Sequence, residues 1–196
     1  MNKLVFEAVL LGEDGVGKKN IIDRYVYGEF DRIYEPTRRD KFITTLTVES
    51  QLIVVEFNKM FFSSYSFLDY YIRKSSVFFL VYSITSIYSF KKIQEMRDMV
   101  IQIKCWDNKT GLPIVLCGNK CDLESERKVT TEEGQKLADE FQCAFFETSA
   151  KNNTNLDVMF QVVVKDLLNY SKSIKSLNIE LTKQKSHNKN IGCLLV

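Results

Sequence analysis

The distribution of apolar residues along the chain predicts a set of buried strands. Nearly continuous apolar runs, rather than alternating ones, are typical of strands that are covered on both faces. Four such runs occur at 3–11, 77–84, 113–118 and 143–147. Two further strands are predicted at 42–48 and 51–57, and because only Glu49 and Ser50 separate them, they are expected to form a hairpin.

Segments with helical spacing separate these strands. Ile21, Ile22, Tyr25 and Val26 share one helical face, and Gly28 marks the end of that helix. Further helices are predicted at about 89–103, 130–141 and 155–170, whereas 59–75 is rich in aromatic residues and serine and shows only weak periodicity. This alternation predicts an α/β fold: a mostly parallel sheet with helices on both faces and one antiparallel edge hairpin. Such sheets bind ligands in the loops beyond the carboxyl ends of their strands.

The composition fits one domain of ordinary soluble character. Apolar residues make up 45% of the 196 residues, and the formal charge of +2 is too small to indicate nucleic-acid binding. No apolar stretch is long enough to predict a membrane-spanning helix. The five cysteines form no CxxC pair and His187 is the only histidine, which argues against a Cys/His zinc site. With an odd number of cysteines and no signal sequence, a reducing, cytosolic compartment is expected.

A glycine-rich segment follows the first predicted strand. Four residues separate Gly12 from Gly17-Lys18, which is the spacing of a phosphate-binding loop. Such a loop needs inward-pointing backbone N–H groups, a lysine that reaches the terminal phosphates, and a helix that begins behind them. A plain strand-to-helix connection is the alternative. The next position, where a hydroxyl residue would ligate Mg²⁺, is Lys19.

Two later loops carry residues suited to guanine. Asn119-Lys120-Cys121-Asp122 directly follows a predicted strand, and a carboxylate at Asp122 can accept hydrogen bonds from N1–H and the 2-amino group of guanine, which adenine lacks. Lys120 would lie along the purine face while Asn119 ties the loops together. The segment 149–151 follows the next strand and offers a backbone N–H to the guanine oxygen. Each segment alone fits a polar turn, but in this order they predict guanine-nucleotide binding.

With these motifs the chain resembles the Ras superfamily of small GTPases over about residues 3–170, nearest to its Ras/Rap branch. The runs LVYSIT, GNKCDLESERKV and CAFFETSAK carry this likeness. The resemblance implies the P-loop small G-protein fold, with GTP or GDP as ligand and Mg²⁺ as the ion. The implied sites are a phosphate site of Gly12, Glu13, Asp14, Gly15, Val16, Gly17, Lys18 and Lys19, a guanine site of Asn119, Lys120, Asp122, Ser149, Ala150 and Lys151, and a first switch of Phe30, Tyr34, Glu35, Pro36, Thr37, Arg38, Arg39 and Asp40.

Within this first switch, the resemblance implies that Phe30 covers the guanine edge and that Thr37 ligates Mg²⁺ and senses the γ-phosphate. Effectors of the family present a basic edge to an acidic loop. Arg38 and Arg39 are therefore expected to disfavour the usual Ras-binding domains and to favour a more acidic partner. A merely solvated charged loop is the alternative.

Several positions depart from the family pattern on the catalytic side. Lys19 would repel Mg²⁺ unless its side chain turns outward, so binding of this ion is expected to be weakened. Asp14 adds bulk and negative charge beside the γ-phosphate. In the second switch, Glu56 would reach Mg²⁺ only through water, and Lys59 and Met60 replace a glycine and the glutamine that orients the attacking water. Very slow GTP hydrolysis is therefore expected.

The composition changes after Tyr170, and residues 171–196 are expected to form a flexible basic tail behind a domain at 1–170. The chain ends in Cys193 and three aliphatic residues, which is a prenylation box, with a free cysteine as the alternative. One lipid chain anchors only marginally, and lysines at 172, 175, 183, 185 and 189 supply a second signal toward an anionic leaflet. The expected location is the cytoplasmic face of a membrane, first of all the plasma membrane.

The sequence therefore predicts a membrane-tethered GTP/GDP switch of Ras/Rap type with very slow hydrolysis. The alternative is a non-hydrolysing pseudoGTPase that acts as a constitutive binding or scaffold module. A nucleotide kinase is disfavoured because no substrate lid or acceptor site is visible. The sequence identifies no exchange factor or GTPase activator, and nucleic acid is not an expected partner.

Overall fold

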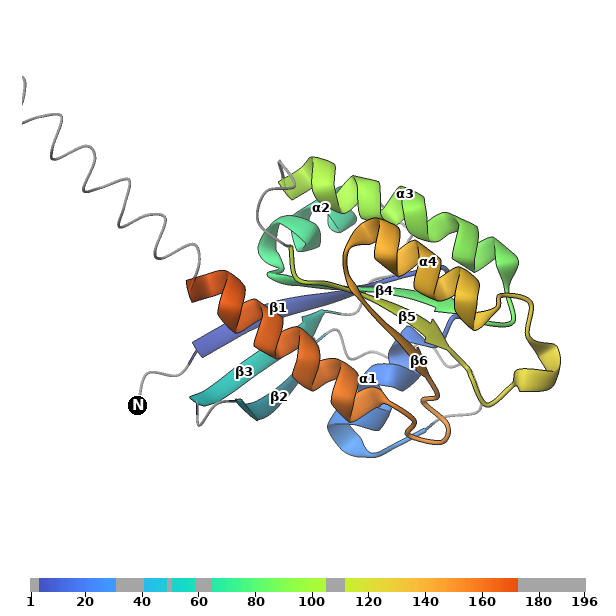
Figure 1. The fold of residues 1–196 in the computed structure, drawn as a ribbon. Coiled ribbons are helices and arrows are strands. Elements are labelled where there is room, and N and C mark those ends of the chain that lie inside the picture. Colours follow the sequence, from blue (N-terminus) through green and yellow to red (C-terminus); the bar gives the residue numbers. More distant parts are fainter. Residues whose placement is uncertain (1–3, 31–40, 49–50, 59–64, 105–111, 173–196) are drawn as a thin grey trace, which may run out of the picture.

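The computed structural model describes residues 4–30, 41–48, 51–58, 65–104 and 112–172 (Figure 1). Strands and helices alternate along most of this length, as the apolar pattern predicts. Residues 156–172 form the last helix. The elements before it are β1 (Leu4–Leu11), α1 (Lys18–Tyr27), β2 (Lys41–Val48), β3 (Gln51–Asn58), α2 (Tyr65–Lys74), β4 (Val77–Ser83), α3 (Ile87–Lys104), β5 (Ile114–Asn119), the 3₁₀ turn η1 (Glu124–Glu126), α4 (Thr131–Phe141) and β6 (Ala144–Thr148).

The six strands form one sheet in the order β2-β3-β1-β4-β5-β6. All neighbouring strands are parallel except β2 and β3, which pair antiparallel from Lys41 opposite Asn58 to Val48 opposite Gln51. The predicted mostly parallel sheet with one antiparallel edge hairpin is therefore confirmed. Its carboxyl edge gathers the loops that follow β1, β5 and β6, which are the three loops that carry the predicted site residues.

Two hydrophobic cores cover the two faces of the sheet. On one face, side chains such as Leu10, Val55 and Phe79 pack against Ile21 of α1 and Phe160 of the last helix. On the other face, residues of α2, α3 and α4 pack against the alternate positions of the same strands, and Figure 1 shows these three helices together on one side of the sheet. Helices on both faces are thus confirmed.

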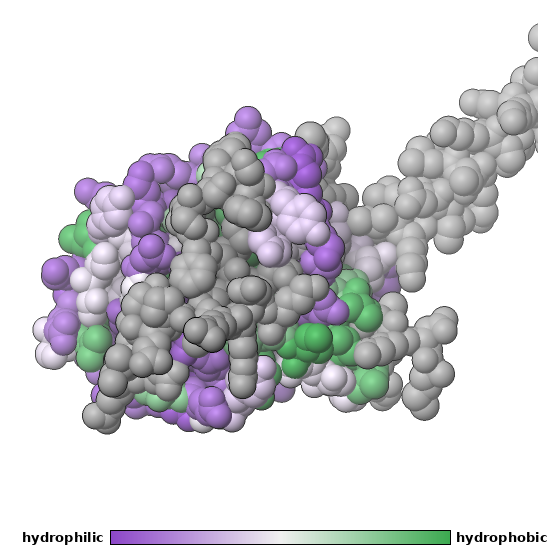
Figure 2. Space-filling view, turned by 180° about the vertical axis from the view of Figure 1, so that it is seen from behind, coloured by the Kyte–Doolittle hydropathy of each residue, from purple (hydrophilic) through white to green (hydrophobic). Residues whose placement is uncertain are grey.

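The helix layer on the second face leaves the hairpin side of the sheet partly open. Val5, Ile43 and Leu52 lie on that face by their register and are about half exposed. Figure 2, which views the molecule from behind, shows hydrophobic surface gathered on this side. None of the helices in the described residues combines the length and the apolar character needed to cross a membrane.

One helix was not predicted. The segment 59–75 showed only weak periodicity, yet α2 spans Tyr65–Lys74 within it. Its anchors are Leu68 and Ile72, which are four residues apart and buried against the sheet. Tertiary packing of these two side chains stabilises the helix where the aromatic and serine-rich composition gives little signal.

Candidate functional site

The loop between β1 and α1 requires glycine at two positions. A Cβ atom on Gly12 would overlap the backbone carbonyl of Val81 in β4, so only glycine lets these two backbones approach. Gly17 caps α1 in the left-handed region, at φ 99°, and a Cβ there would overlap the side-chain amide of Asn119. The loop is therefore shaped by the neighbouring strands β4 and β5 and not by its own sequence alone.

The charges of this loop suit an anion. Lys18 begins α1 and folds back across the loop, where its Nζ donates to the carbonyl oxygens of Gly12 at 2.6 Å and Glu13 at 2.9 Å. The first turn of α1 contains no acidic residue, so the positive end of the helix dipole faces the loop without an opposing carboxylate from this turn. Asp14 lies exposed on the loop.

Asn119 ties this loop to the end of the sheet. The residue is only 2% exposed, and its Nδ2 donates to the carbonyl oxygen of Val16 at 2.8 Å. Its Oδ1 accepts from the hydroxyl of Thr148 in β6 at 3.1 Å. A single buried side chain thus connects the glycine loop, β5 and β6.

The carboxylate of Asp122 is held by the neighbouring loop. Its Oδ1 accepts from the hydroxyl of Ser149 at 2.5 Å, and its Oδ2 lies 3.8 Å from Nζ of Lys151. The backbone supports this position: Lys120 adopts a left-handed φ of 69°, and the N–H of Cys121 donates to the carbonyl oxygen of Thr148 at 3.0 Å. The Asp122 side chain is only 8% exposed and presents a fixed acceptor.

These segments enclose a pocket of about 400 Å³, which is the size range of small-ligand sites. It unites residues that are more than a hundred positions apart in the sequence. The predicted residues in its lining are Gly17, Phe30, Asn119, Lys120, Asp122, Ala150 and Lys151, and Asn20 and Leu123 complete it.

Arg24 of α1 is a part of this arrangement that the sequence did not indicate. Its Nε donates to the carbonyl oxygen of Ala150 at 2.8 Å and its Nη2 to that of Lys151 at 2.8 Å, while Nη1 binds the carbonyl oxygen of Gly28 at 2.7 Å. One guanidinium thereby fixes the loop after β6 to the end of α1. Only its place in the last helical turn, where cations are favoured, gave any sequence signal.

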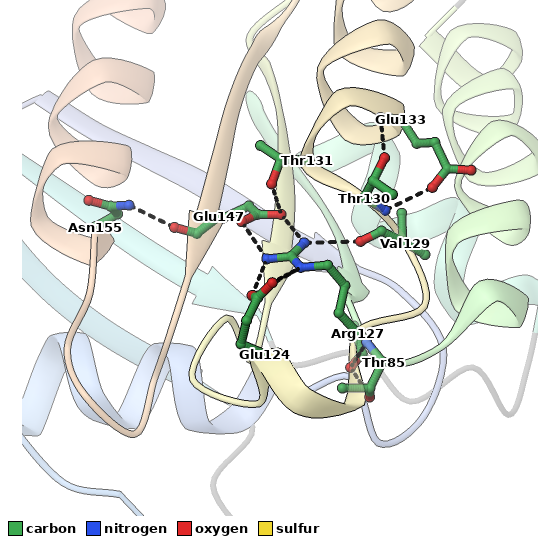
Figure 3. A network of polar contacts seen from close by, with 10 residues as sticks. Thr85, Glu124, Arg127, Val129, Thr130, Thr131, Glu133, Glu147 and Asn155 are labelled. Atoms are coloured by element: carbon green, nitrogen blue, oxygen red, sulfur yellow. Dashed lines mark hydrogen bonds and ion pairs between the residues drawn. The ribbon is translucent and has the colours of Figure 1, made fainter.

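A polar network around Arg127 joins the two loops on the purine side (Figure 3). Its guanidinium binds both carboxylate oxygens of Glu147 in β6, at 2.6 and 2.9 Å, and both of Glu124 in η1. Thr131 also donates to Glu147, at 3.2 Å. The hydrogen bond to Glu147 makes the largest contribution to raising the pKa of Arg127, and the bond to Glu124 makes the next largest. The hydrogen bond from Arg127 in turn lowers the pKa of Glu124. The network therefore fixes η1, which follows Asp122, to the strand that precedes Ser149.

A comparison of the sequence with models of protein families identifies the family of this chain. The model of the Ras family matches residues 7–169, which is more than four fifths of the chain. The chain belongs to the Ras family. Its domain is therefore a small GTPase-like domain that binds guanine nucleotides. In this Ras-family chain, residues of the glycine loop, the Asn119–Asp122 loop and the 149–151 loop line one pocket.

The register of β3 argues against the predicted metal role of Glu56. Glu56 is opposite Glu7 of β1, five positions before Gly12, and so lies about 16 Å below the glycine loop at ~3.3 Å per residue. It borders Lys74, whose Nζ is 2.5 Å from Glu7. The hydrogen bond to Glu7 and the nearby charge of Glu56 raise the pKa of Lys74. Glu56 is thus part of a charge cluster in the middle of the sheet.

The other switch predictions lie outside the described residues. This holds for the first-switch segment 34–40, which includes Thr37, for Lys59 and Met60 of the second switch, and for Cys193 of the tail. Phe30 is the exception, since it lines the pocket and packs partly against the core below α1.

The described residues do not fit Mg²⁺, the ion usual in the Ras family. The position that directly follows Lys18 holds an ammonium group, which donates hydrogen bonds and cannot ligate a cation. Nζ of Lys19 lies 2.9 Å from Oδ2 of Asp23, one turn along α1. Within the parts of the chain that the structure describes, no three His, Cys, Asp or Glu side chains are grouped to hold a metal ion.

Proposed function

We propose that this chain is a Ras/Rap-like switch that binds GTP and GDP and hydrolyses GTP very slowly. The observation that carries the proposal is the fixed carboxylate of Asp122 in a pocket beside the glycine loop. Guanine offers two neighbouring N–H donors to such a carboxylate, and the glycine loop with Lys18 supplies the phosphate end of the site.

Slow hydrolysis is proposed from the residues around the phosphate end. Asp14 puts a carboxylate on the glycine loop, where its bulk and charge oppose the attacking water and a negatively charged transition state. Met60, outside the described residues, has no group that can orient a water molecule. The alternative, a pseudoGTPase that serves as a binding or scaffold module, is favoured by Lys19, because its ammonium group, paired with Asp23, stands at the position where a hydroxyl would ligate the metal.

The first test is to identify the nucleotide that the protein carries. The purified full chain is denatured, and the released ligand is separated by chromatography. GTP is the expected product if guanine nucleotide binds and is not cleaved, whereas mostly GDP would contradict slow hydrolysis. An adenine nucleotide would contradict the proposal as a whole.

A base-specificity variant makes this test sharper. Asp122→Asn replaces one acceptor oxygen with an N–H donor, which no longer matches the 2-amino group of guanine but matches the 2-oxo group of xanthine. The variant should lose GDP affinity by at least about tenfold, because one charge-assisted hydrogen bond is lost. It should gain affinity for xanthosine diphosphate. Glu126→Gln, a matched change on the exposed surface of η1, should alter neither affinity.

Partners and location follow as further proposals. Arg38 and Arg39 favour an acidic effector surface over the basic edge of a standard Ras-binding domain. Prenylation of Cys193 and the tail lysines would hold the protein at the cytoplasmic face of a membrane, first of all the plasma membrane. Release of a Cys193→Ser variant into the soluble fraction would support this location, and its retention on membranes would contradict it.

A further inference from the structure

Lys19 and Asp23 form an ion pair beside the glycine loop. The two residues are one turn apart in α1, and Nζ of Lys19 lies 2.9 Å from Oδ2 of Asp23. Their side chains are only 11% and 10% exposed. Lys19 directly follows Lys18, which is bonded to the carbonyl oxygens of the loop. The first turn of α1 therefore carries a second lysine, whose ammonium group is bonded to Asp23 one turn further along.

This pair differs from an ordinary charged helix face. Lys92 and Glu95 of α3 form a comparable pair, but their side chains are 32% and 65% exposed. Burying two charges has a large desolvation cost, and apolar residues of similar size often stabilise a fold better. Folding stability alone therefore does not explain a buried lysine at position 19. A role of this lysine in ligand binding would explain it.

Lys19 cannot take the role of the hydroxyl residue that usually ligates a divalent ion at this position. A P-loop site needs positive charge next to the phosphates, and a divalent ion supplies it when the helix begins with a hydroxyl ligand. Here the side chain at that position is itself a cation. Asp23 is the nearest described carboxylate on the helix, and it is already bonded to the ammonium group of Lys19.

We infer that Lys19, held by Asp23, supplies the positive charge that a divalent ion would otherwise bring, so that this chain binds guanine nucleotide without a divalent ion. The inference rests on the proposed function, because it assumes guanine-nucleotide binding. Asp23 acts as a positioning residue: its carboxylate keeps the ammonium group buried instead of extended into solvent. Lys18, Lys19 and the N-terminus of α1 then balance the phosphate charge together.

The test compares the affinity of the full chain for a fluorescent GDP analogue in excess Mg²⁺ and in excess chelator. The wild-type protein should show dissociation constants within about threefold of each other, less than the effect of one net hydrogen bond. In Lys19→Ser/Asp23→Ala, which restores a hydroxyl and removes both charges, affinity should fall by at least about tenfold when Mg²⁺ is chelated. Lys19→Arg, which keeps a cation, should stay independent of Mg²⁺.

Controls separate this inference from the proposed function. Arg73→Ser breaks the exposed i,i+4 ion pair of α2 with Asp69 and should leave the ratio of the two affinities unchanged, and thermal unfolding verifies that each variant folds. A tenfold loss of wild-type affinity in chelator would overturn the inference and leave guanine binding intact. A double variant that stays independent of Mg²⁺ would also overturn it. No binding of GDP under either condition would overturn both proposals.

Discussion

At the scale of single residues, Asn119 explains how the two halves of the nucleotide site stay together. Its amide donates to the glycine loop at Val16 and accepts from Thr148, so both ends of the group are satisfied while the side chain is buried. Gly17 is needed for the same contact, since any Cβ would collide with this amide. The glycine loop, proposed to bind phosphate, and the strands that carry the proposed guanine loops therefore share one buried hydrogen-bonded centre.

Replacing Asn119 by alanine should loosen both halves of the site. The change leaves the carbonyl of Val16 and the hydroxyl of Thr148 without this partner, which costs about 1–3 kcal/mol of folding free energy. GDP should also dissociate at least about tenfold faster. Urea unfolding and stopped-flow dissociation measure the two effects. Asn155→Ala, which removes an exposed bond to the carbonyl of Glu147, is the control, and equal effects in both variants would contradict the role of Asn119.

At the scale of elements, the short turn η1 depends on its neighbours. It has three residues and no side-chain cap at its start, so it cannot hold a fixed position by its own hydrogen bonds. Arg127, which follows it, binds Glu124 inside the turn and Glu147 on β6. Because Asp122 precedes η1 and Ser149 follows β6, this bridge sets the distance between the two loops that the pocket needs.

The variant Arg127→Met, which keeps an unbranched stem about as long as the arginine side chain up to Nε but removes the guanidinium group and its charge, should separate these loops. Hydrogen exchange should become faster at 120–126 and 147–151, while α1 and the glycine loop change less. GDP affinity should fall more than affinity for inosine diphosphate, because the latter lacks the 2-amino group that Asp122 accepts. Arg73→Met removes an exposed i,i+4 pair with Asp69 and serves as the control. An unchanged ratio of the two affinities would show that Arg127 does not position Asp122.

At the scale of the whole molecule, the sequence predicts the elements better than their register. Long apolar runs mark the strands locally, and α4 begins at Thr131, close to the start of the helix predicted at about 130–141. The structure adds a capping box between Thr130 and Glu133 at this start. The alignment of Glu56 with Glu7 is set by packing across parallel strands, which no local pattern records. The same holds for Arg24 and Ala150, whose contact joins positions 126 residues apart. The four-residue spacing of Lys19 and Asp23 is suited to an ion pair on a helix, but the burial of this pair can be seen only in the folded structure.

The two cores on either side of the sheet also determine how stability depends on pH. Cys117 of β5 is fully buried, with its thiol 3.1 Å from the hydroxyl of Thr148. Burial raises the pKa of this thiol to about 12, whereas an unfolded cysteine has a pKa of about 8.5. Between these values only the unfolded state loses the proton, so folding stability falls as the pH rises through this window and is intact below it.

Comparison with Cys117→Ala isolates this effect, because alanine cannot ionise. Near neutral pH the variant should be less stable by about 1 kcal/mol, since it leaves a small cavity and an unpaired Thr148 hydroxyl. From pH 8 to pH 10 the wild-type protein should lose about 2 kcal/mol that the variant retains. The gap in unfolding free energy should therefore close and then reverse, as urea titrations at a series of pH values would measure. Other tyrosines and cysteines ionise in both proteins and cancel in the difference. Parallel curves over this range would mean that the Cys117 thiol titrates alike in the folded and unfolded chain, and that the core around β5 admits water.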